Sequence, residues 1–148
     1  MSRAETLAIP AEIFAAMVEH CRREAPMEAC GILGGVPPLV SSIHPLRNVE
    51  QSAVLYTADP VDLIATDRAL RERGAEWLVI YHSHPRSAPI PSKVDLKLNY
   101  DDPTPKMIIS LMAEPPQARL WRLSVDAFEE LPWRLLPAVD VEYAEWAE

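Results

Sequence analysis

The chain has little of what marks secreted, membrane-spanning or disulfide-rich proteins. Its 148 residues contain two cysteines, Cys21 and Cys30, which are too few for a disulfide framework and lack CxxC spacing. No apolar run approaches the length needed to span a bilayer, and the N-terminal "MSRAETLAIPAEIF" lacks the apolar core of a signal peptide. We therefore expect a cytoplasmic protein in which both cysteines are small buried hydrophobic residues.

Positive charge is also scarce. Lysine and arginine number 14 against 22 aspartates and glutamates, so the formal net charge is −8. Without a basic stripe there is no electrostatic footprint for nucleic acid, and an acidic surface disfavours anionic lipid. We expect neither nucleic acid nor a membrane as a partner, whereas a basic protein or peptide stays possible.

What the sequence does contain is the composition of a folded domain. Hydrophobic residues make up 49% of the chain and charged residues 24%, and the length suits one core. We expect a single domain over residues 1–148 that includes an acidic C-terminal tail at about 138–148. This tail is either a solvated segment or a docking surface for a basic partner.

Two helices are marked by their ends and their periodicity. Residues 9–25 place apolar side chains at helical spacing, with Pro10 in the first turn. Residues 60–73 have Asp59 as a cap, Pro60 at the first position and Gly74 after the last turn. A shorter helix is expected at residues 93–100.

The strands are predicted from short apolar runs bounded by glycine and proline. They lie in "MEACGILGGVPP", "LVSSIHPLRNV", "AEWLVIYHSH", "KMIISLM" and "ARLWRLSV", and one more is expected in the C-terminal "LPWRLLPAVDVEYAEWAE". Because helices and strands alternate, the fold class is α/β or α+β, with a mixed sheet and flanking helices.

One loop carries an unusual density of polar chemistry: "YHSHPRSAPIPSKVD", residues 81–95. His82 and His84 stand two apart at the end of a strand, so both imidazoles point to one face. Ser92 can cap the helix that follows, and Asp95 in its first turn can project toward the histidines. Two histidines, an aspartate and an open position are a ligand set typical of catalytic zinc.

Each feature alone also has an ordinary explanation. A surface His-x-His pair is often without function, "SKVD" can be a plain capping box, and prolines stiffen loops. Together at this spacing they favour a site over coincidence. Cys30, His20 and His44 lack partner spacing, so we interpret them as packing or surface residues.

The string His82-x-His84-Pro85, six residues, Ser92-x-x-Asp95 resembles the signature of the JAMM (MPN+) metalloprotease family. Glu28 in "MEACGILGG" matches the glutamate that the family places upstream, although without the family it would be interpreted as a solvated carboxylate. The resemblance implies an MPN-like layered architecture similar to that of cytidine deaminases. It also implies one Zn²⁺ held by His82, His84 and Asp95, with Glu28 as general base and Ser92 as hydrogen-bond donor to the oxyanion.

The resemblance further implies a substrate class. Family members hydrolyse amide or isopeptide bonds beside the C-terminal tail of ubiquitin-like proteins, and this short chain is similar to small bacterial members that trim sulfur-carrier proteins to their Gly-Gly end. Two alternatives are a non-catalytic MPN scaffold, disfavoured because all five residues are present, and a DNA-repair-associated relative, disfavoured by the acidic charge.

Overall fold

A computed structural model describes residues 6–100 and 102–138 of the chain. Apart from Ala138, the predicted acidic tail lies outside these residues. The described part forms strands and helices in the order β1 (Leu7–Pro10), α1 (Ala11–Glu24), β2 (Cys30–Val36), β3 (Leu39–Leu46), α2 (Pro60–Glu72), β4 (Glu76–His84), α3 (Lys93–Lys97), β5 (Lys106–Ser110), β6 (Gln117–Leu123), β7 (Phe128–Leu131) and β8 (Trp133–Leu136).

The strands form one mixed sheet in the order β7-β6-β5-β4-β2-β3-β1-β8. The pairs β4–β5, β1–β3 and β1–β8 are parallel, and the other neighbours are antiparallel. Strands β7 and β8 form the two edges, although Pro132 alone separates them along the chain. The sheet must therefore curl until its edges come close together.

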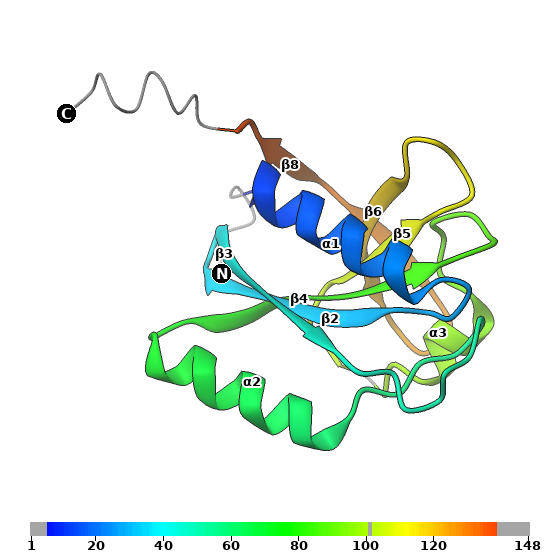
Figure 1. Cartoon of the computed structure of the whole chain (residues 1–148), viewed down its shortest axis with the longest axis horizontal. Helices are drawn as coiled ribbons and strands as arrows, with labels where there is room; N and C mark the ends of the chain where they lie inside the picture. The colour runs from blue at the N-terminus through cyan, green and yellow to red at the C-terminus, as the bar shows by residue number, and fades with distance from the viewer. Residues whose placement is uncertain (1–5, 101, 139–148) are drawn as a thin grey trace.

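Helices cover both faces of this sheet. Figure 1 shows α1 and α2 on opposite sides of strands β2, β3 and β4. On the α1 face, Met17 and Cys21 of the helix join Val79 and Ile109 of the sheet in the larger buried cluster. On the α2 face, Leu70 packs with residues of β2 in a second cluster. The predicted mixed sheet with flanking helices is confirmed.

Strand β4 occupies the centre of the sheet and positions the histidines. It pairs antiparallel with β2, with Cys30 opposite His82, and parallel with β5, with Ile108 beside His82. The Tyr81 side chain points to the α1 face, where its hydroxyl lies 2.7 Å from His20 Nδ1. Its ring also occupies the space that a Cβ at Gly31 would need. The packing of α1 therefore fixes the strand that carries the site.

The predicted 60–73 helix is confirmed in detail. Asp59 accepts a hydrogen bond from the Val61 amide at 2.9 Å, Pro60 opens α2, and Gly74 after its end has φ +68. Both cysteines are buried free thiols, as their interpretation as small hydrophobic residues requires. His20 is buried against Tyr81 and His44 is half-buried beside Ser42, so both are packing residues.

Other predicted boundaries were wrong. Pro10 does not lie in a first helical turn: its backbone is extended, with φ −62 and ψ 146, and it ends β1 before α1 begins at Ala11. Helix α3 ends at Lys97 instead of residue 100: Leu98 is its C-cap, with φ −91 and ψ 6, and Tyr100 with φ 52 adopts the left-handed conformation, which is not helical. The expected single C-terminal strand is β8, preceded by an unpredicted β7.

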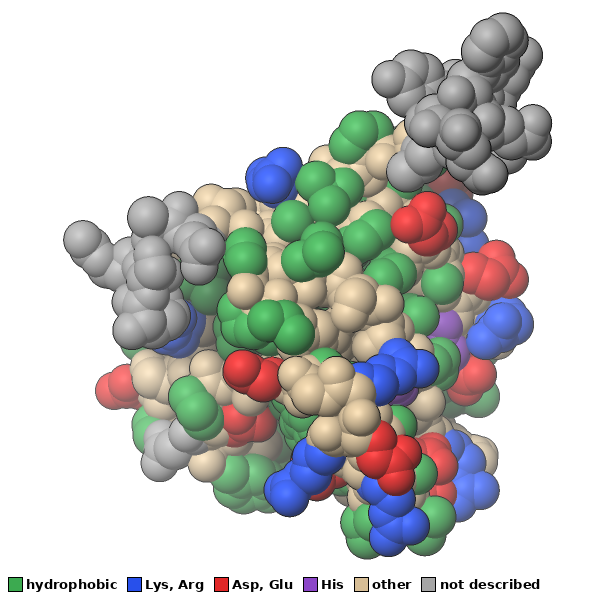
Figure 2. Space-filling model, turned by 90° about the vertical axis from the view of Figure 1, so that its left-hand side faces the viewer, with side chains coloured by type: hydrophobic (Ala, Val, Ile, Leu, Met, Phe, Trp, Pro, Cys, Tyr) green, Lys and Arg blue, Asp and Glu red, His purple; other side chains and the backbone are tan. Residues whose placement is uncertain are grey.

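Charged side chains of both signs lie on the surface of the described chain. Figure 2 shows one face on which blue and red side chains alternate below a region of hydrophobic ones. Among the described residues, no helix is both long and apolar enough to cross a bilayer.

Candidate metal centre

Strand β4 ends in two buried histidines whose side chains share one face of the sheet. His82 and His84 are 1% and 4% exposed, and their ring centroids lie 5.1 Å apart. The two-residue strand period brings them to one face, as predicted. Because buried polar groups are destabilising without partners, both imidazoles need polar neighbours or a bound ligand.

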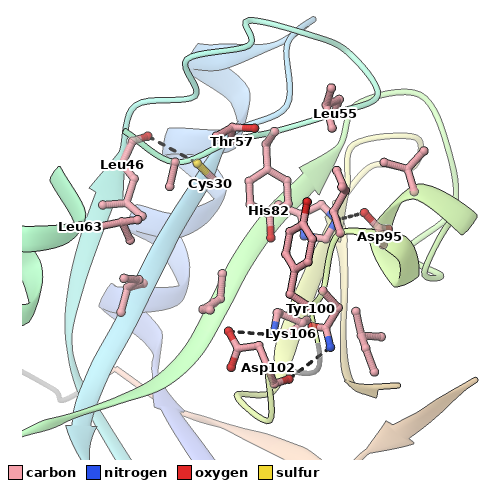
Figure 3. A pocket seen from close by; sticks show the side chains of 18 of the residues that line it. Cys30, Leu46, Leu55, Thr57, Leu63, His82, Asp95, Tyr100, Asp102 and Lys106 are labelled. Atoms are coloured by element: carbon pink, nitrogen blue, oxygen red, sulfur yellow. Dashed lines mark hydrogen bonds and ion pairs between the residues drawn. The ribbon is translucent and has the colours of Figure 1, made fainter. Parts of the chain in front are cut away.

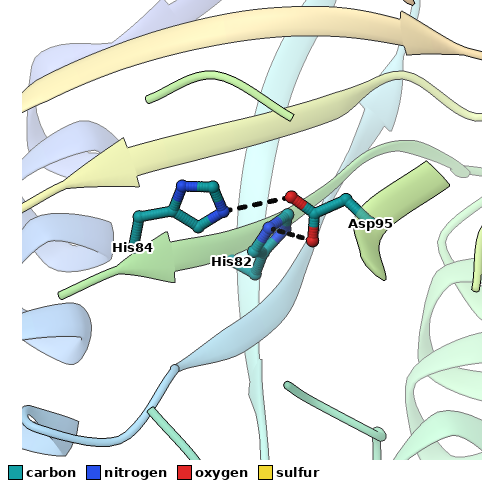
Figure 4. Close-up of side chains that lie close together, drawn as sticks. All are labelled: His82, His84 and Asp95. Carbon is teal, nitrogen blue, oxygen red and sulfur yellow. Dashed lines mark hydrogen bonds and ion pairs between the residues drawn. The ribbon is translucent and has the colours of Figure 1, made fainter. Parts of the chain in front are cut away.

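Asp95 faces both histidines from the first turn of α3. Its Oδ1 lies 3.1 Å from His82 Nε2 and its Oδ2 lies 3.1 Å from His84 Nε2 (Figure 4). One donor atom from each of these three residues falls within 4.8 Å of the others. The structure thus brings the three predicted ligands together into a group that can hold a metal ion.

Asp95 and His84 stabilise each other's charged forms. Burial raises the pKa of Asp95, but the adjacent His82 and His84 lower it further, so the net pKa lies well below the usual range. Burial lowers the pKa of His84, yet its hydrogen bonds to Asp95 and the Ala88 carbonyl raise it above the usual value overall. The carboxylate is therefore ionised at neutral pH, as a metal ligand must be.

The hydrogen bonding of the rings fits a metal. The Ala88 carbonyl accepts a hydrogen bond from His84 Nδ1 at 2.8 Å, so Nε2, which contacts Asp95 Oδ2 at 3.1 Å, is the ring atom that would lose its proton and bind a metal. His82 Nε2 is buried close to Asp95 but makes no aligned hydrogen bond within the described chain. An orphaned imidazole nitrogen and a carboxylate oxygen aimed at common space are what a cation with His and Asp ligands requires.

The proline-rich loop 85–91 is fixed by three consecutive carbonyls. The Ser87 carbonyl accepts from Ser110 Oγ at 2.6 Å, and the Pro89 carbonyl accepts from Trp121 Nε1 at 2.9 Å. His84 Nδ1 contacts the Ala88 carbonyl between them. Strands β5 and β6 thus hold the loop in the course that returns α3 to the histidines.

Glu28 is buried rather than solvated, with 3% exposure. Continuing the β2–β4 register from Cys30 opposite His82 places Glu28 opposite His84, on the same face of the sheet. Burial raises its pKa to about 8; the nearby His84 partly offsets this, and Asp95 adds to it. Its Oε1 has no hydrogen-bond partner in the described part of the chain. The carboxyl group is therefore available to a ligand or to water.

Ser92 is the N-cap of α3 and forms a full capping box with Asp95. Its Oγ accepts from the Asp95 amide at 3.0 Å, and its own amide donates to Asp95 Oδ2 at 2.9 Å. The capping box that "SKVD" predicts is thus present, but it does not exclude a second role for Ser92. The Ser92 hydroxyl proton is not used in the box and can still be donated.

A pocket of about 450 Å³ opens beside the three ligands (Figure 3). His82 and Asp95 form part of its wall, and the rest is mainly apolar, contributed by β2, β4, loop 55–58 and the segment after α3. Lys106 stands at the end of the pocket near Asp102, 3.6 Å from its carboxylate. This volume is within the range of ligand-binding pockets.

Sequence reasoning did not identify two residues that contact this centre. Tyr56 stacks on the His82 ring, with centroids 4.8 Å apart and planes inclined by 27°. Asn48 is buried and binds the backbone of both Glu28 and the Tyr56 loop. Neither carries a motif, and the contacts join segments far apart in sequence. Cys30 lines the pocket but lies outside the ligand group.

Comparisons with known proteins identify relatives of this chain. It is similar to the CysO-cysteine peptidase of Mycobacterium tuberculosis, 37% identical over 94 residues, which are 62% of this chain and 64% of that protein. It is also similar to the probable TtuB-protein conjugate cleaving protease of Thermus thermophilus, 42% identical over 79 residues, or 53% of each chain. The matches therefore span less than two thirds of the length of these two relatives.

Solved structures agree in fold. The solution structure of protein DSY2949 from Desulfitobacterium hafniense superposes with a TM-score of 0.81 and 27% identity, covering 93% of this chain and 97% of that one. AF2198, a JAB1/MPN domain protein from Archaeoglobus fulgidus, gives a TM-score of 0.60 with 15% identity over 88% and 98% of the chains, which shows a shared fold alone.

The family model of prokaryotic homologs of the JAB domain matches residues 10–124, a range that holds Glu28 and the whole span from His82 to Asp95. This match covers well over half of the chain and agrees with the fold and with the resemblance seen in the sequence. The chain therefore belongs to the prokaryotic JAB-domain family.

Proposed function

We propose that this protein is a zinc-dependent peptidase or isopeptidase. Its substrate is an amide bond adjacent to the C-terminal Gly-Gly tail of a ubiquitin-like or sulfur-carrier protein. The observation that supports this most strongly is Glu28, whose Oε1 has no hydrogen-bond partner among the described residues and which is buried beside the group of His82, His84 and Asp95. A scaffold has no need for this arrangement, because buried polar groups without partners are destabilising.

His82, His84 and Asp95 would hold the ion. Zinc bound there supplies a Lewis acid that polarises an amide carbonyl and makes water a stronger acid. Identification of the metal as zinc follows from the ligand types and the family, since imidazole also suits other transition metals.

Glu28 would act as the general base. Its carboxylate takes a proton from the attacking water and then delivers it to the amine nitrogen that leaves. Burial raises the pKa of Glu28 to about 8 in the metal-free protein, and a bound cation would lower this pKa and favour the carboxylate that accepts a proton. Burial also restricts the carboxyl group to few rotamers, which keeps it aimed at the reacting atoms.

Ser92 would stabilise the negative charge that develops on the carbonyl oxygen. The capping box fixes its Oγ, which accepts from the Asp95 amide while the hydroxyl proton stays free for donation. Loss of one such donor costs about 10²–10³ in kcat in enzymes that use it.

The apolar pocket beside the ligands would receive the tail of the substrate protein. The names of the two relatives, a CysO-cysteine peptidase and a probable TtuB-protein conjugate cleaving protease, describe enzymes that cleave protein conjugates and support this substrate class. The acidic overall charge disfavours the nucleic-acid alternative.

The experiment is a cleavage assay read by intact mass. Zinc-loaded protein is incubated with a panel of sulfur-carrier and ubiquitin-like proteins extended past Gly-Gly by one residue or by an isopeptide-linked lysine. We expect at least one substrate to lose its extension and end at Gly-Gly. Unchanged masses across the panel would count strongly against the proposal.

The matched control is Glu28→Gln, which keeps the size of the side chain and removes the base. We expect this variant to keep its zinc and to lose about 10²–10⁴ in turnover. Cleavage at the wild-type rate would show that the base is wrongly assigned.

A further inference from the structure

The two histidines of the metal centre are held in different ways. Histidine ligands usually donate their second ring nitrogen to an acceptor, which fixes the plane of the ring. His84 has such a contact, with Nδ1 2.8 Å from the Ala88 carbonyl. His82 has none, because neither of its ring nitrogens has a hydrogen-bond partner among the residues that the structure describes. The contact of His82 Nε2 with Asp95 Oδ1 at 3.1 Å holds one edge of the ring, so the plane of the ring depends on packing against its faces.

Tyr56 is the side chain that packs on this ring. The centroids are 4.8 Å apart and the planes are inclined by only 27°, which is a stacked arrangement. The other aromatic neighbour, His84, is tilted by 59° at 5.1 Å and is itself a proposed ligand. Rotation of His82 about its Cβ–Cγ bond would therefore break its contact with Tyr56.

Asn48 fixes the backbone on both sides of Tyr56. Its Nδ2 donates to the Leu55 carbonyl at 3.1 Å, and its Oδ1 accepts from the Thr57 amide at 3.0 Å. The residues immediately before and after the tyrosine are thus bound by one buried side chain.

The same asparagine also binds the segment that carries the candidate base. Nδ2 donates to the Glu28 carbonyl at 3.0 Å, and Oδ1 accepts from the Glu50 amide at 3.0 Å. The amide therefore uses both donor hydrogens and both acceptor lone pairs. In addition, the Glu28 amide donates to the Ser52 carbonyl of the same loop at 2.7 Å.

We infer that Tyr56 is a positioning residue for the metal ligand His82, and that Asn48 acts through Tyr56 by holding loop 48–57 against the Glu28 segment. This inference rests on the proposed function, since it concerns the affinity of the same site for zinc. Stacking of Tyr56 takes the place of the missing hydrogen-bond acceptor at His82. Asn48 couples the position of this ligand to that of the candidate base, Glu28.

The test measures the dissociation constant for zinc by competition with a chromophoric chelator, on the full chain. Tyr56→Leu removes the aromatic face, and we expect zinc affinity to fall about tenfold, as for other outer partners of metal ligands. Tyr56→Phe keeps the ring, and we expect affinity within about twofold of the wild type. Equal losses in both variants, or no loss in Tyr56→Leu, would overturn the inference.

Asn48→Asp tests the second part. It is isosteric, but it places an acceptor against the carbonyls of Glu28 and Leu55. We expect an affinity loss of about tenfold in the wild-type background and of less than about twofold in the Tyr56→Leu background, because residues that act through one another are not additive. Full additivity would show that Asn48 does not act through Tyr56.

Two controls separate this role from general stability and from failure of the proposed function. Phe14→Leu removes an aromatic side chain from a stack on α1, against Trp133 and outside the pocket, and is expected to leave zinc affinity unchanged. Denaturation in excess chelator measures the free energy of unfolding of each metal-free variant. If Tyr56 and Asn48 only stabilise the fold, their substitution will lower this free energy and the zinc affinity in proportion. If the wild type binds no zinc, the proposed function fails; if it binds zinc and Tyr56→Leu binds it equally well, the inference alone fails.

Discussion

At the scale of single residues, the burial of Glu28 sets the chemistry of the site. A carboxyl group at 3% exposure is expensive to ionise, and this is why burial raises its pKa to about 8. The ordinary value of the same group is 4.5. Between these two pH values, in the metal-free protein, the folded state keeps a proton that the unfolded state releases.

This difference has a definite sign for stability. The contribution of protonated Glu28 is fully present below about pH 4.5 and is lost as pH rises through the folded pKa of about 8. Glu28→Gln cannot ionise and has no such loss. We therefore expect the free energy of unfolding of the wild type, relative to Glu28→Gln, to fall by roughly 2–4 kcal/mol between pH 5 and pH 9.

The measurement is urea denaturation of the metal-free proteins in excess chelator at pH 5, 7 and 9. Glu12→Gln is the matched control, because Glu12 is exposed on α1 and its substitution should give a difference that does not change over this range. If the free energies of unfolding of the wild type and Glu28→Gln change with pH in parallel, burial does not raise the pKa of Glu28.

Residue chemistry explains which parts of the candidate site the sequence predicts. His82 and His84 share a face because of the strand period, and Asp95 follows a capping serine, so both relations are local and visible in the sequence. The burial of Glu28 depends on the segment around Ser52, which no local pattern indicates. The contact of Tyr56 with His82 cannot be predicted from the sequence, because the two rings lie in different segments and stacking requires no fixed spacing between residues.

At the scale of elements, loop 85–91 connects β4 to α3 and determines whether Asp95 meets the histidines. Its anchors come from β5 and β6: Ser110 Oγ to the Ser87 carbonyl and Trp121 Nε1 to the Pro89 carbonyl. Ser110 is 1% exposed, so its hydrogen bonds are sheltered from competing water.

We expect Ser110→Ala to lower the free energy of unfolding by about 1–2 kcal/mol and to weaken zinc binding severalfold. The physical reason is that the Ser87 carbonyl and the Met112 amide both lose their partner, which loosens the loop. Denaturation and chelator competition measure the two effects. Ser124→Ala is the control, because its hydroxyl makes a similar bond to the Ala127 carbonyl at an exposed turn; equal effects in both variants would refute the role of the loop.

The elements themselves were predictable to the extent that their signals are local. Helix α2 carries its cap, its first proline and its terminal glycine in sequence, and it forms where expected. Strand β1 has only four residues and exists because it pairs with β8, whose residues lie more than a hundred positions later. Such a short strand gives no periodic signal, so the sequence predicts that Pro10 belongs to the helix instead.

At the scale of the whole molecule, an aromatic contact joins α1 to the edge strand β8. Trp133 at the start of the edge strand β8 stacks on Phe14 of α1, with centroids 5.6 Å apart and planes inclined by 22°. This contact joins the helix that follows β1 to the strand that pairs with β1. It therefore links the two ends of the described chain.

A double-mutant cycle of Phe14→Leu and Trp133→Leu tests this contact. We expect each variant alone to lower the free energy of unfolding and the pair to show a coupling of about 0.5–1.5 kcal/mol, the usual size for an aromatic pair. The measurement is denaturant unfolding of all four proteins. Strictly additive losses would mean that the stack does not contribute to holding the edge strand.

The central claim, that His82, His84 and Asp95 form a zinc site, is tested most directly by metal content. Wild type, Glu28→Gln and Asp95→Asn are dialysed against excess zinc, freed of unbound metal, checked for folding by circular dichroism, and measured by elemental analysis. The account predicts one zinc ion per chain in the first two proteins and little or none in Asp95→Asn. A folded wild type without zinc, or an Asp95→Asn variant that retains it fully, would contradict the account.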